Sequence, residues 1–336
     1  MRSIYVVQDG GSIRRQGAAL HVYRGRDRLD IVHVHDVDQV VLVGNIVVTP
    51  SALELLVDRG IDVVLLSHHG RFRARIGSDV SRQVALRIAQ MRALVFDADR
   101  AADLARRIVA GKLANCRTLL QRAARRHGRT DAIARAVAGL RAAIVRTGRA
   151  VDPDEIRGCE GSGTAAYFRA FGDLIRAPGF AFPGRNRRPP MDPVNALLSL
   201  GYTLLSNVVE GAVRTVGLDP FVGALHAPLT GRPSLVCDLV EEMRAPAVDA
   251  VVLAVINRGM LTPEHFDDPG DGEPVVVKRD GMRIFIDAFE RRMRSAARYP
   301  PEDRRLAYRD IIEQQVRHLA RVVLGRQPHY EPYRIE

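Results

Sequence analysis

Short apolar runs separated by turn residues fill the first 76 positions of the chain. The runs are rich in Val, Ile or Tyr, and the pairs Asp9-Gly10 and Arg24-Gly25 stand between neighbouring runs, which is the pattern of β-hairpins. One segment, Ser51–Arg59, is spaced like a helix and is followed by Gly60. The expected strands are Ser3–Val7, Ala19–Tyr23, Asp30–His35, Val40–Val43, Asp62–Leu66 and Arg71–Ile76.

After Gly77 the apolar positions recur every three to four residues, which is the period of an α-helix with one buried face. The expected helices are Arg82–Phe96, Arg100–Ala110, Arg117–Arg126, Ala132–Arg146, Ala165–Ile175, Pro193–Val216, Ser234–Ala245, Ala247–Arg258, Gly281–Arg298 and Glu302–Leu324. We therefore predict an α+β fold in which a small strand-rich domain (residues 1–76) precedes a larger all-α-helical domain (77–325) and a loose C-terminal tail (326–336).

The charge balance adds a partner to this picture. The chain has 336 residues, with 50 Lys and Arg against 39 Asp and Glu, so its formal net charge is +11. Lys112 and Lys278 are the only lysines, and the arginines that supply the other charges bind phosphate through a planar fork of donors. A biased genomic base composition would explain the choice of Arg but not the surplus of positive charge. The composition therefore favours a polyanionic partner such as nucleic acid.

Two further observations concern the compartment. The three cysteines are scattered, which predicts no disulfide framework. The N-terminal apolar run is too short for a signal peptide, and we see no apolar stretch of membrane-spanning length. We expect a cytoplasmic protein with no membrane partner.

The segment from His226 to Arg244 gathers carboxylates on one helical face. Asp238 and Glu241 are three residues apart and point to the same side of the expected helix, and Glu242 follows directly. Such carboxylates repel each other unless positive charge lies between them. Arg244 would supply that charge as a structural ion pair. A divalent cation would supply it too, with His226 completing a nitrogen and oxygen ligand set suited to Mn²⁺ or Mg²⁺. The spacing alone leaves both interpretations open.

A second polar block places Glu160 among small residues. Gly161 and Gly163 are poor residues for a helix interior, so we expect Glu160 near the start of the helix that follows. A carboxylate there serves as a simple cap. Alternatively, the small neighbours allow a phosphate or a backbone to come close to it.

A third block is the loop Phe180–Pro190, whose prolines and glycine exclude regular structure. Its three arginines, Arg185, Arg187 and Arg188, make it strongly basic. We predict that they contact DNA phosphates, so that DNA affinity falls steeply with salt. The alternative is a basic surface that is merely solvated.

These blocks carry a family resemblance. The runs GCEGSGTAAYF, FPGRNRRPPMDPVNALLSLGYTLL and GALHAPLTGRPSLVCDLVEEMRAPAVDAVVLAVINRGML resemble, in order and spacing, the CRISPR-associated spacer-acquisition endonuclease/integrase family. The resemblance spans nearly the whole chain. It implies a metal-dependent enzyme of antiviral defence that uses Mg²⁺ or Mn²⁺ and joins prespacer 3′ ends into the CRISPR repeat. The chain departs from the family pattern at Asn115-Cys116, where Asn-Gln is expected.

The resemblance also implies which residues act. Carried onto this sequence, the catalytic and metal-binding residues are Glu160, His226 and Glu241. Asp238 matches a position near the metal, where it either supports these ligands or lies beside a second ion. The reaction itself needs no covalent side-chain nucleophile, because a strand's own 3′-hydroxyl suffices for transesterification.

Assembly follows from the same resemblance. The family implies double-stranded DNA as substrate, a homodimer and a small second adaptation protein that bridges two dimers. The strand edges and apolar positions of residues 1–76, such as Val40, Val41, Ile46 and Val47, favour that part as the dimer interface. Two other functions stay open on the sequence: a non-catalytic DNA-binding scaffold, and a structure-selective nuclease or integrase outside CRISPR immunity.

Overall fold

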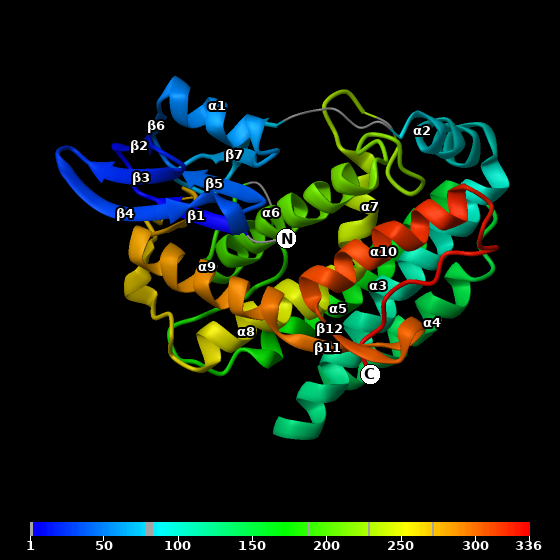
Figure 1. Cartoon of the computed structure of the whole chain (residues 1–336). Coiled ribbons are helices and arrows are strands. Elements are labelled where there is room, and N and C mark those ends of the chain that lie inside the picture. The colour runs from blue at the N-terminus through cyan, green and yellow to red at the C-terminus, as the bar shows by residue number, and fades with distance from the viewer. Residues whose placement is uncertain (1–2, 78–82, 187–188, 228, 271) are drawn as a thin grey trace. The chain divides into compact units, whose positions relative to one another are not determined.

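The computed structural model describes residues 3–77, 83–186, 189–227, 229–270 and 272–336. The chain divides into two compact units, Met1–Val80 and Ser81–Glu336. Strands dominate the first unit and helices the second (Figure 1), which confirms the predicted α+β class. The predicted domain boundary at residue 76 coincides with the last residue of the final strand of the first unit, β8.

The described residues of the first unit form two four-stranded sheets, one α-helix and a short 3-10 helix, Val34–Asp36. One sheet has the order β1-β5-β7-β8, with β1, β5 and β7 parallel and β8 antiparallel, and the other has the order β4-β3-β2-β6. The elements are β1 (Ser3–Val7), β2 (Gly11–Gln16), β3 (Ala19–Arg24), β4 (Asp27–His33), β5 (Gln39–Val43), β6 (Ile46–Val48), α1 (Pro50–Asp58), β7 (Asp62–Leu66) and β8 (Phe72–Ile76).

In the first unit the structure adds two strands, β2 and β6, that the sequence pattern did not predict. The half of β2 that follows Ile13 is polar, and β6 has only three residues, so neither shows a clear alternation. Of the apolar positions expected at a dimer surface, Val40 and Val41 are buried within this chain and Val47 is 62% exposed. Val40 in fact belongs to the core of the first unit.

Helices make up most of the second unit, but two short β-hairpins lie among them, so the prediction of an all-α-helical domain is wrong at these places. Its elements are α2 (Val84–Met91), α3 (Ala98–His127), α4 (Asp131–Thr147), α5 (Pro153–Phe171), α6 (Pro193–Val216), α7 (Ser234–Met243), α8 (Ala250–Asn257), β9 (Phe266–Asp267), β10 (Val276–Val277), α9 (Arg279–Arg294), β11 (Ala296–Tyr299), β12 (Arg304–Ala307) and α10 (Tyr308–Val323).

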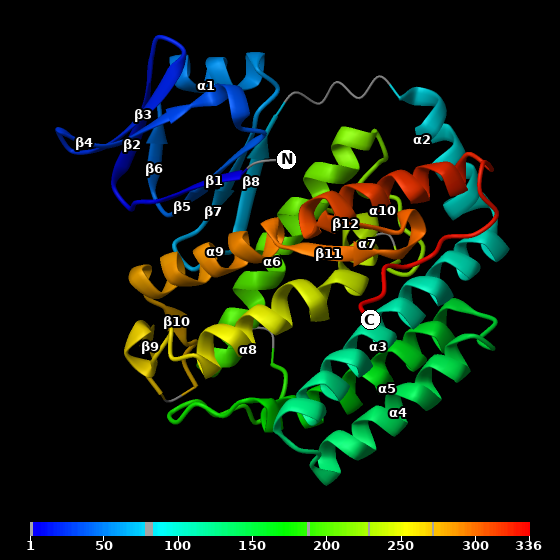
Figure 2. The same cartoon turned by 60° about the horizontal axis from the view of Figure 1, so that its bottom comes forward.

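A single long helix, α3, replaces two shorter helices that the periodicity predicted. The residues between those two, Gly111–Cys116, are all buried, so the amphipathic pattern disappears where the helix crosses the interior. Helices α3, α4 and α5 pack against one another and lie side by side in both views (Figures 1 and 2).

Helix α5 also begins earlier than predicted, which moves Glu160 from a helix start to the middle of a helix. Asp152 caps α5 by accepting hydrogen bonds from the backbone N–H groups of Asp154 and Glu155, each at 2.8 Å. The glycines that argued against a helix serve its packing. A Cβ at Gly163 would lie 2.5 Å from Leu113 of α3, so only glycine lets the two helices approach this closely.

Pro246 does not end the helical path after α7, as the sequence had indicated. The chain continues through a π-helical turn, Arg244–Asp249, directly into α8. The wider turn accommodates a residue that lacks a backbone N–H, and Arg292 donates to the Pro246 carbonyl at 2.8 Å.

The tail after residue 325 is packed rather than loose, so that prediction is wrong. Tyr330, Tyr333 and Ile335 are buried although the segment has no regular secondary structure. Asn115 of α3 holds it by donating to the Tyr333 carbonyl at 2.9 Å and accepting from the Ile335 N–H at 2.9 Å. In Figures 1 and 2 the tail, in red, returns from α10 toward α3. Burial of these aromatic rings stabilises the packed tail, although the composition of the segment is mostly polar.

Helix α6 is the one described helix that is long and apolar enough to cross a membrane. The prediction that no apolar stretch reaches membrane-spanning length is therefore wrong for α6. In the structure, 72% of its most apolar window is buried inside the protein, as expected for a central core helix.

Candidate active site

Three helices bring together the residues of the candidate site. Lys112 of α3 reaches with Nζ to Glu160 Oε1 on α5 and lies 2.6 Å from Glu241 Oε2 on α7. The structure thus unites two acids that are far apart in the sequence. Lys112, which joins the two acids, is not among the site residues that the sequence predicts. A lysine whose direct neighbours are apolar indicates a buried ion pair, because a buried ammonium needs an acidic partner. Lys112 is in fact only 4% exposed.

Glu241 is ionised in this setting. Burial alone would raise its pKa, but Arg244, 3.0 Å away, and Lys112 together lower the pKa of Glu241 to about 2. Burial likewise opposes the charge on Lys112, yet Glu241 and Glu160 raise the pKa of its ammonium above the ordinary value. The centre therefore carries fixed, opposite charges in a place shielded from water.

Asp238 holds His226 in position. Its Oδ1 lies 2.7 Å from His226 Nδ1, and the carboxylate also accepts the backbone N–H groups of Ala224, Leu225 and His226 at 2.6–3.0 Å. A fully buried carboxylate surrounded by these donors fixes the imidazole tautomer, because Nδ1 must carry the proton. In the neutral imidazole the other ring nitrogen, Nε2, then has a free lone pair, and it lies 3.9 Å from Glu241 Oε1.

Glu242 does not belong to the site, although the sequence placed it beside Asp238 and Glu241. Its carboxylate points to the tail, where Tyr330 Oη donates at 2.6 Å and the Tyr333 backbone N–H at 2.8 Å. Adjacent residues on a helix point about 100° apart, so one acid faces the site and the next faces the tail.

Arg244 is held by an aromatic ring. Its guanidinium lies 4.9 Å from the centre of the Tyr202 ring, a cation–π contact that keeps the charge beside Glu241. The Tyr202 hydroxyl donates to Asp249 at 2.7 Å, and burial raises the pKa of Asp249 to about 6. Tyr202 and Asp249, which are not among the three predicted catalytic residues, thus hold the positive charge of Arg244 beside Glu241.

The donor set suits a hard divalent cation. Glu160 and Glu241 offer carboxylate oxygens, and His226 offers the Nε2 lone pair. Glu241 Oε2 is buried, and the Lys112 ammonium lies 2.6 Å from it, so a cation at this oxygen would have to displace or share that contact. Within the described residues, however, no three His, Cys, Asp or Glu side chains are grouped as a preformed metal site. The Lys112 ammonium lies between the two carboxylates instead.

The basic loop is only partly described. Arg185 is turned inward: it donates to Asn195 Oδ1 at 2.6 Å and to Ser199 Oγ at 3.2 Å, and it lies 5.5 Å from the centre of the Tyr202 ring. Arg187 and Arg188 lie outside the described residues. DNA contact by this loop stays a prediction.

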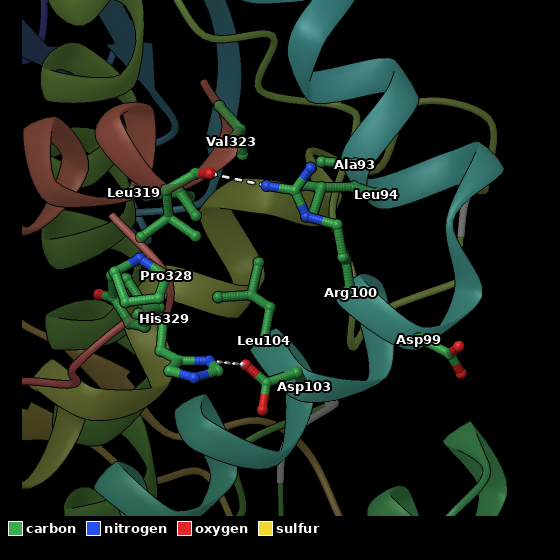
Figure 3. A pocket seen from close by; sticks show the side chains of 12 residues that line it. Ala93, Leu94, Asp99, Arg100, Asp103, Leu104, Leu319, Val323, Pro328 and His329 are labelled. Carbon is green, nitrogen blue, oxygen red and sulfur yellow. Dashed lines mark hydrogen bonds and ion pairs between the residues drawn. The ribbon is translucent and has the colours of Figure 1, made fainter. Parts of the chain in front are cut away.

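A separate cavity of about 190 Å³ lies between α3, α10 and the start of the tail (Figure 3). Its walls include Leu104 and Leu319. At its rim His329 Nδ1 lies 3.2 Å from Asp103, and Arg100 donates to the Val322 carbonyl at 2.8 Å. None of the predicted catalytic residues lines it, so the carboxylate centre and not this cavity is the candidate site.

The comparisons with known proteins agree with the resemblance seen in the sequence. The model of the family described as CRISPR associated protein Cas1 matches residues 4–291. The CRISPR-associated endonuclease Cas1 3 of Thermus thermophilus is 38% identical over 334 residues, which cover 99% of this chain and 97% of that protein.

Two solved structures share the fold. A casposase bound to integration product superposes with a TM-score of 0.85 at 22% identity, covering 100% of this chain and 96% of the casposase. A Cas6-RT-Cas1–Cas2 complex superposes with a TM-score of 0.82 at 23% identity, covering 99% of this chain and 36% of the matched chain. At these identities the likeness concerns the fold alone.

Proposed function

The chain belongs to the Cas1 family of CRISPR-associated proteins, and on that premise we propose that it is a metal-dependent DNA endonuclease and integrase of spacer acquisition. In this proposal it inserts prespacer DNA into a CRISPR array by attack of a 3′-hydroxyl on the repeat. The observation that carries the proposal is that Lys112 pairs with both Glu160 and Glu241, and that His226 Nε2 lies 3.9 Å from Glu241 Oε1.

The chain's own residues account for several requirements of phosphoryl transfer. Glu160 and Glu241 present anionic oxygens, and Asp238 orients His226 so that Nε2 faces Glu241. Arg244 and Lys112 keep Glu241 ionised, so a cation meets a carboxylate without first displacing a proton. A bound Mg²⁺ or Mn²⁺ would supply charge neutralisation at the attacked phosphate. Lys112 would then have to share or yield its carboxylate contacts.

A non-catalytic scaffold is the weaker alternative. Three charged groups buried at one place cost folding free energy, and a protein that only binds DNA gains nothing from them. An integrase or nuclease outside CRISPR immunity would use the same centre, and the casposase shares only the fold with this chain. The family membership favours the CRISPR reading.

For assembly we propose a homodimer through the first unit, double-stranded DNA as substrate, and Cas2 as the small second adaptation protein, at work in the cytoplasm. The supporting observation for the last partner is the similar Cas6-RT-Cas1–Cas2 complex. Two joining reactions at the ends of one repeat need two centres at a fixed separation, which a two-fold dimer supplies.

The test is a joining assay. A labelled duplex with free 3′-hydroxyl ends is incubated with a repeat-containing plasmid and Mn²⁺, with and without Cas2. We expect joined product for the wild type, none for Glu241→Ala, and wild-type levels for the control Glu264→Gln, which changes an exposed acid of the same unit. Full joining by Glu241→Ala would refute the assignment of the centre. Cleavage of branched DNA without any joining to the repeat would leave only the nuclease function.

A further inference from the structure

The loop that leads to His226 is fixed at its start by a buried glutamine. Gln90 of α2 is fully buried and donates with Nε2 to the carbonyls of Asp219, at 2.9 Å, and Val222, at 2.7 Å. Its Oε1 accepts the Asp219 N–H at 2.8 Å. One side chain thus satisfies three backbone groups of a single turn, which holds that turn in one conformation.

The same loop is fixed again where it meets α7. The N–H of Leu235 donates to the Pro220 carbonyl at 3.0 Å. Asp238 accepts the N–H groups that close the loop, up to His226. A Cβ at Gly223 would lie 2.7 Å from Asp238 Oδ2, so the backbone rests directly on the helix. From residue 219 to residue 226 the loop is therefore a rigid part of the site.

This rigid loop exposes one aromatic ring. Within residues 218–226, all of which are described, only Phe221 is exposed, with 47% of its surface accessible. Its N–H donates to Asp219 Oδ1 at 2.8 Å, which fixes the turn at the ring's own position. A single exposed apolar residue is common on protein surfaces. What sets Phe221 apart is that its backbone cannot relax to hide the ring.

The ring is carried by the loop that ends at His226 and contacts the start of α7. The contact between Pro220 and Leu235 places the turn at the N-terminal end of α7, the helix that carries Glu241. Six residues of α-helix separate Leu235 from Glu241, a rise of about 9 Å. A rise of about 9 Å corresponds to about two to three nucleotides along a stacked DNA strand, at about 3.4 Å each.

We propose that Phe221 is a stacking platform for a nucleobase of the DNA strand next to the phosphate that reacts. The inference rests on the proposed function, because it requires DNA at the carboxylate centre. Stacking on an aromatic ring accepts every base, as insertion of unrelated spacers requires, and it suits a positively charged protein that grips the strand by its phosphates. A rigid support makes the platform effective, since no loop has to be ordered on binding.

A fluorescent base tests this directly. A series of duplexes with single-stranded 3′ extensions carries one 2-aminopurine at successive positions, and binding is followed in EDTA, so that no strand is cut. We expect one position to be quenched by the wild type and by Phe221→Tyr. Phe221→Ala should lose that quenching and bind DNA about 5- to 100-fold more weakly. The control Phe96→Ala removes another exposed ring of the same unit, 78% accessible, and should behave as the wild type.

The outcomes separate the two proposals. If the wild type binds no DNA, the proposed function fails, and the platform fails with it. If the wild type binds and Phe221→Ala keeps both affinity and quenching, only the platform is overturned. If Phe221→Ala binds DNA normally but loses association with Cas2, the ring is a protein contact and the platform is again overturned. Equal melting temperatures of all variants exclude unfolding as the cause of any loss.

Discussion

The buried acid Glu242 offers a quantitative test of how the tail is held. Burial raises its pKa to about 7 from an ordinary value of 4.5, even though hydrogen bonds from Tyr330 and Gln315 lower it. The folded protein therefore holds a proton that the unfolded chain releases between these two values. The stability that this proton contributes is fully present below pH 4.5 and is lost as the pH rises through about 7.

The magnitude follows from the same two values. At about 1.4 kcal/mol for each pKa unit, the difference between 4.5 and about 7 corresponds to about 3 kcal/mol of unfolding free energy. Glu242→Gln cannot ionise, so it lacks this contribution to the pH dependence. Between pH 5 and pH 8 the wild type should lose about 2 to 3 kcal/mol more stability than the variant. Other titrating groups, such as Asp249, are common to both proteins and cancel in the comparison.

Urea unfolding at a series of pH values measures this difference. The chain has no Trp, and six of its eight tyrosines, including Tyr330 and Tyr333, lie in the second unit, so near-ultraviolet circular dichroism of tyrosine reports on the right part. Glu264→Gln, the same change at an exposed site, is the control and should follow the wild type. Parallel pH profiles for the wild type and Glu242→Gln would refute the reasoning.

Two further predictions concern the centre, and a third concerns the packing of the helices that carry it. Lys112→Met removes the cation between two acids and should cost about 3–5 kcal/mol in EDTA, with Mn²⁺ raising the melting temperature more than in the wild type; an equal rise in both would contradict it. Asp238→Asn should weaken Mn²⁺ binding about 10- to 100-fold by calorimetry, because the tautomer of His226 is no longer fixed. Unchanged affinity would show that Asp238 does not orient His226 for metal binding. Gly163→Ala should lower stability by about 1–3 kcal/mol, since its Cβ meets α3, whereas Gly161→Ala, with open space around it, should be neutral or gain up to about 1 kcal/mol in thermal unfolding; equal effects would remove the packing argument.

The sequence predicted the class of fold better than the position of its parts. Short strands and amphipathic helices can be predicted because burial of one face produces a regular spacing of apolar residues along the chain. That period vanishes where a helix is buried on all sides, which is why α3 was divided into two. It also fails where glycine is used for close approach, which is why Glu160 was placed at a helix start.

Spacing rules could not predict two contacts, one within the site and one beside it. Spacing along one helix shows which acids share a face, but not that Glu242 turns to the tail, because the partner Tyr330 is distant in sequence. Lys112 likewise finds Glu160 and Glu241 only through the packing of three helices. Contacts between segments far apart in the chain depend on the tertiary structure, and the local spacing of apolar residues carries no information about it.

The hydrogen bonds of Glu242 also constrain which substitutions are tolerated at these positions in related sequences. Its carboxylate, the Tyr330 hydroxyl and the Gln315 amide form one buried polar unit spread over three segments. Replacing any one member leaves the others without partners in the interior, so a single substitution is harmful where a joint replacement by apolar residues is tolerated. These three positions should therefore covary among relatives, and a homologue with an apolar residue at the position of Glu242 should have lost the polar groups at the other two.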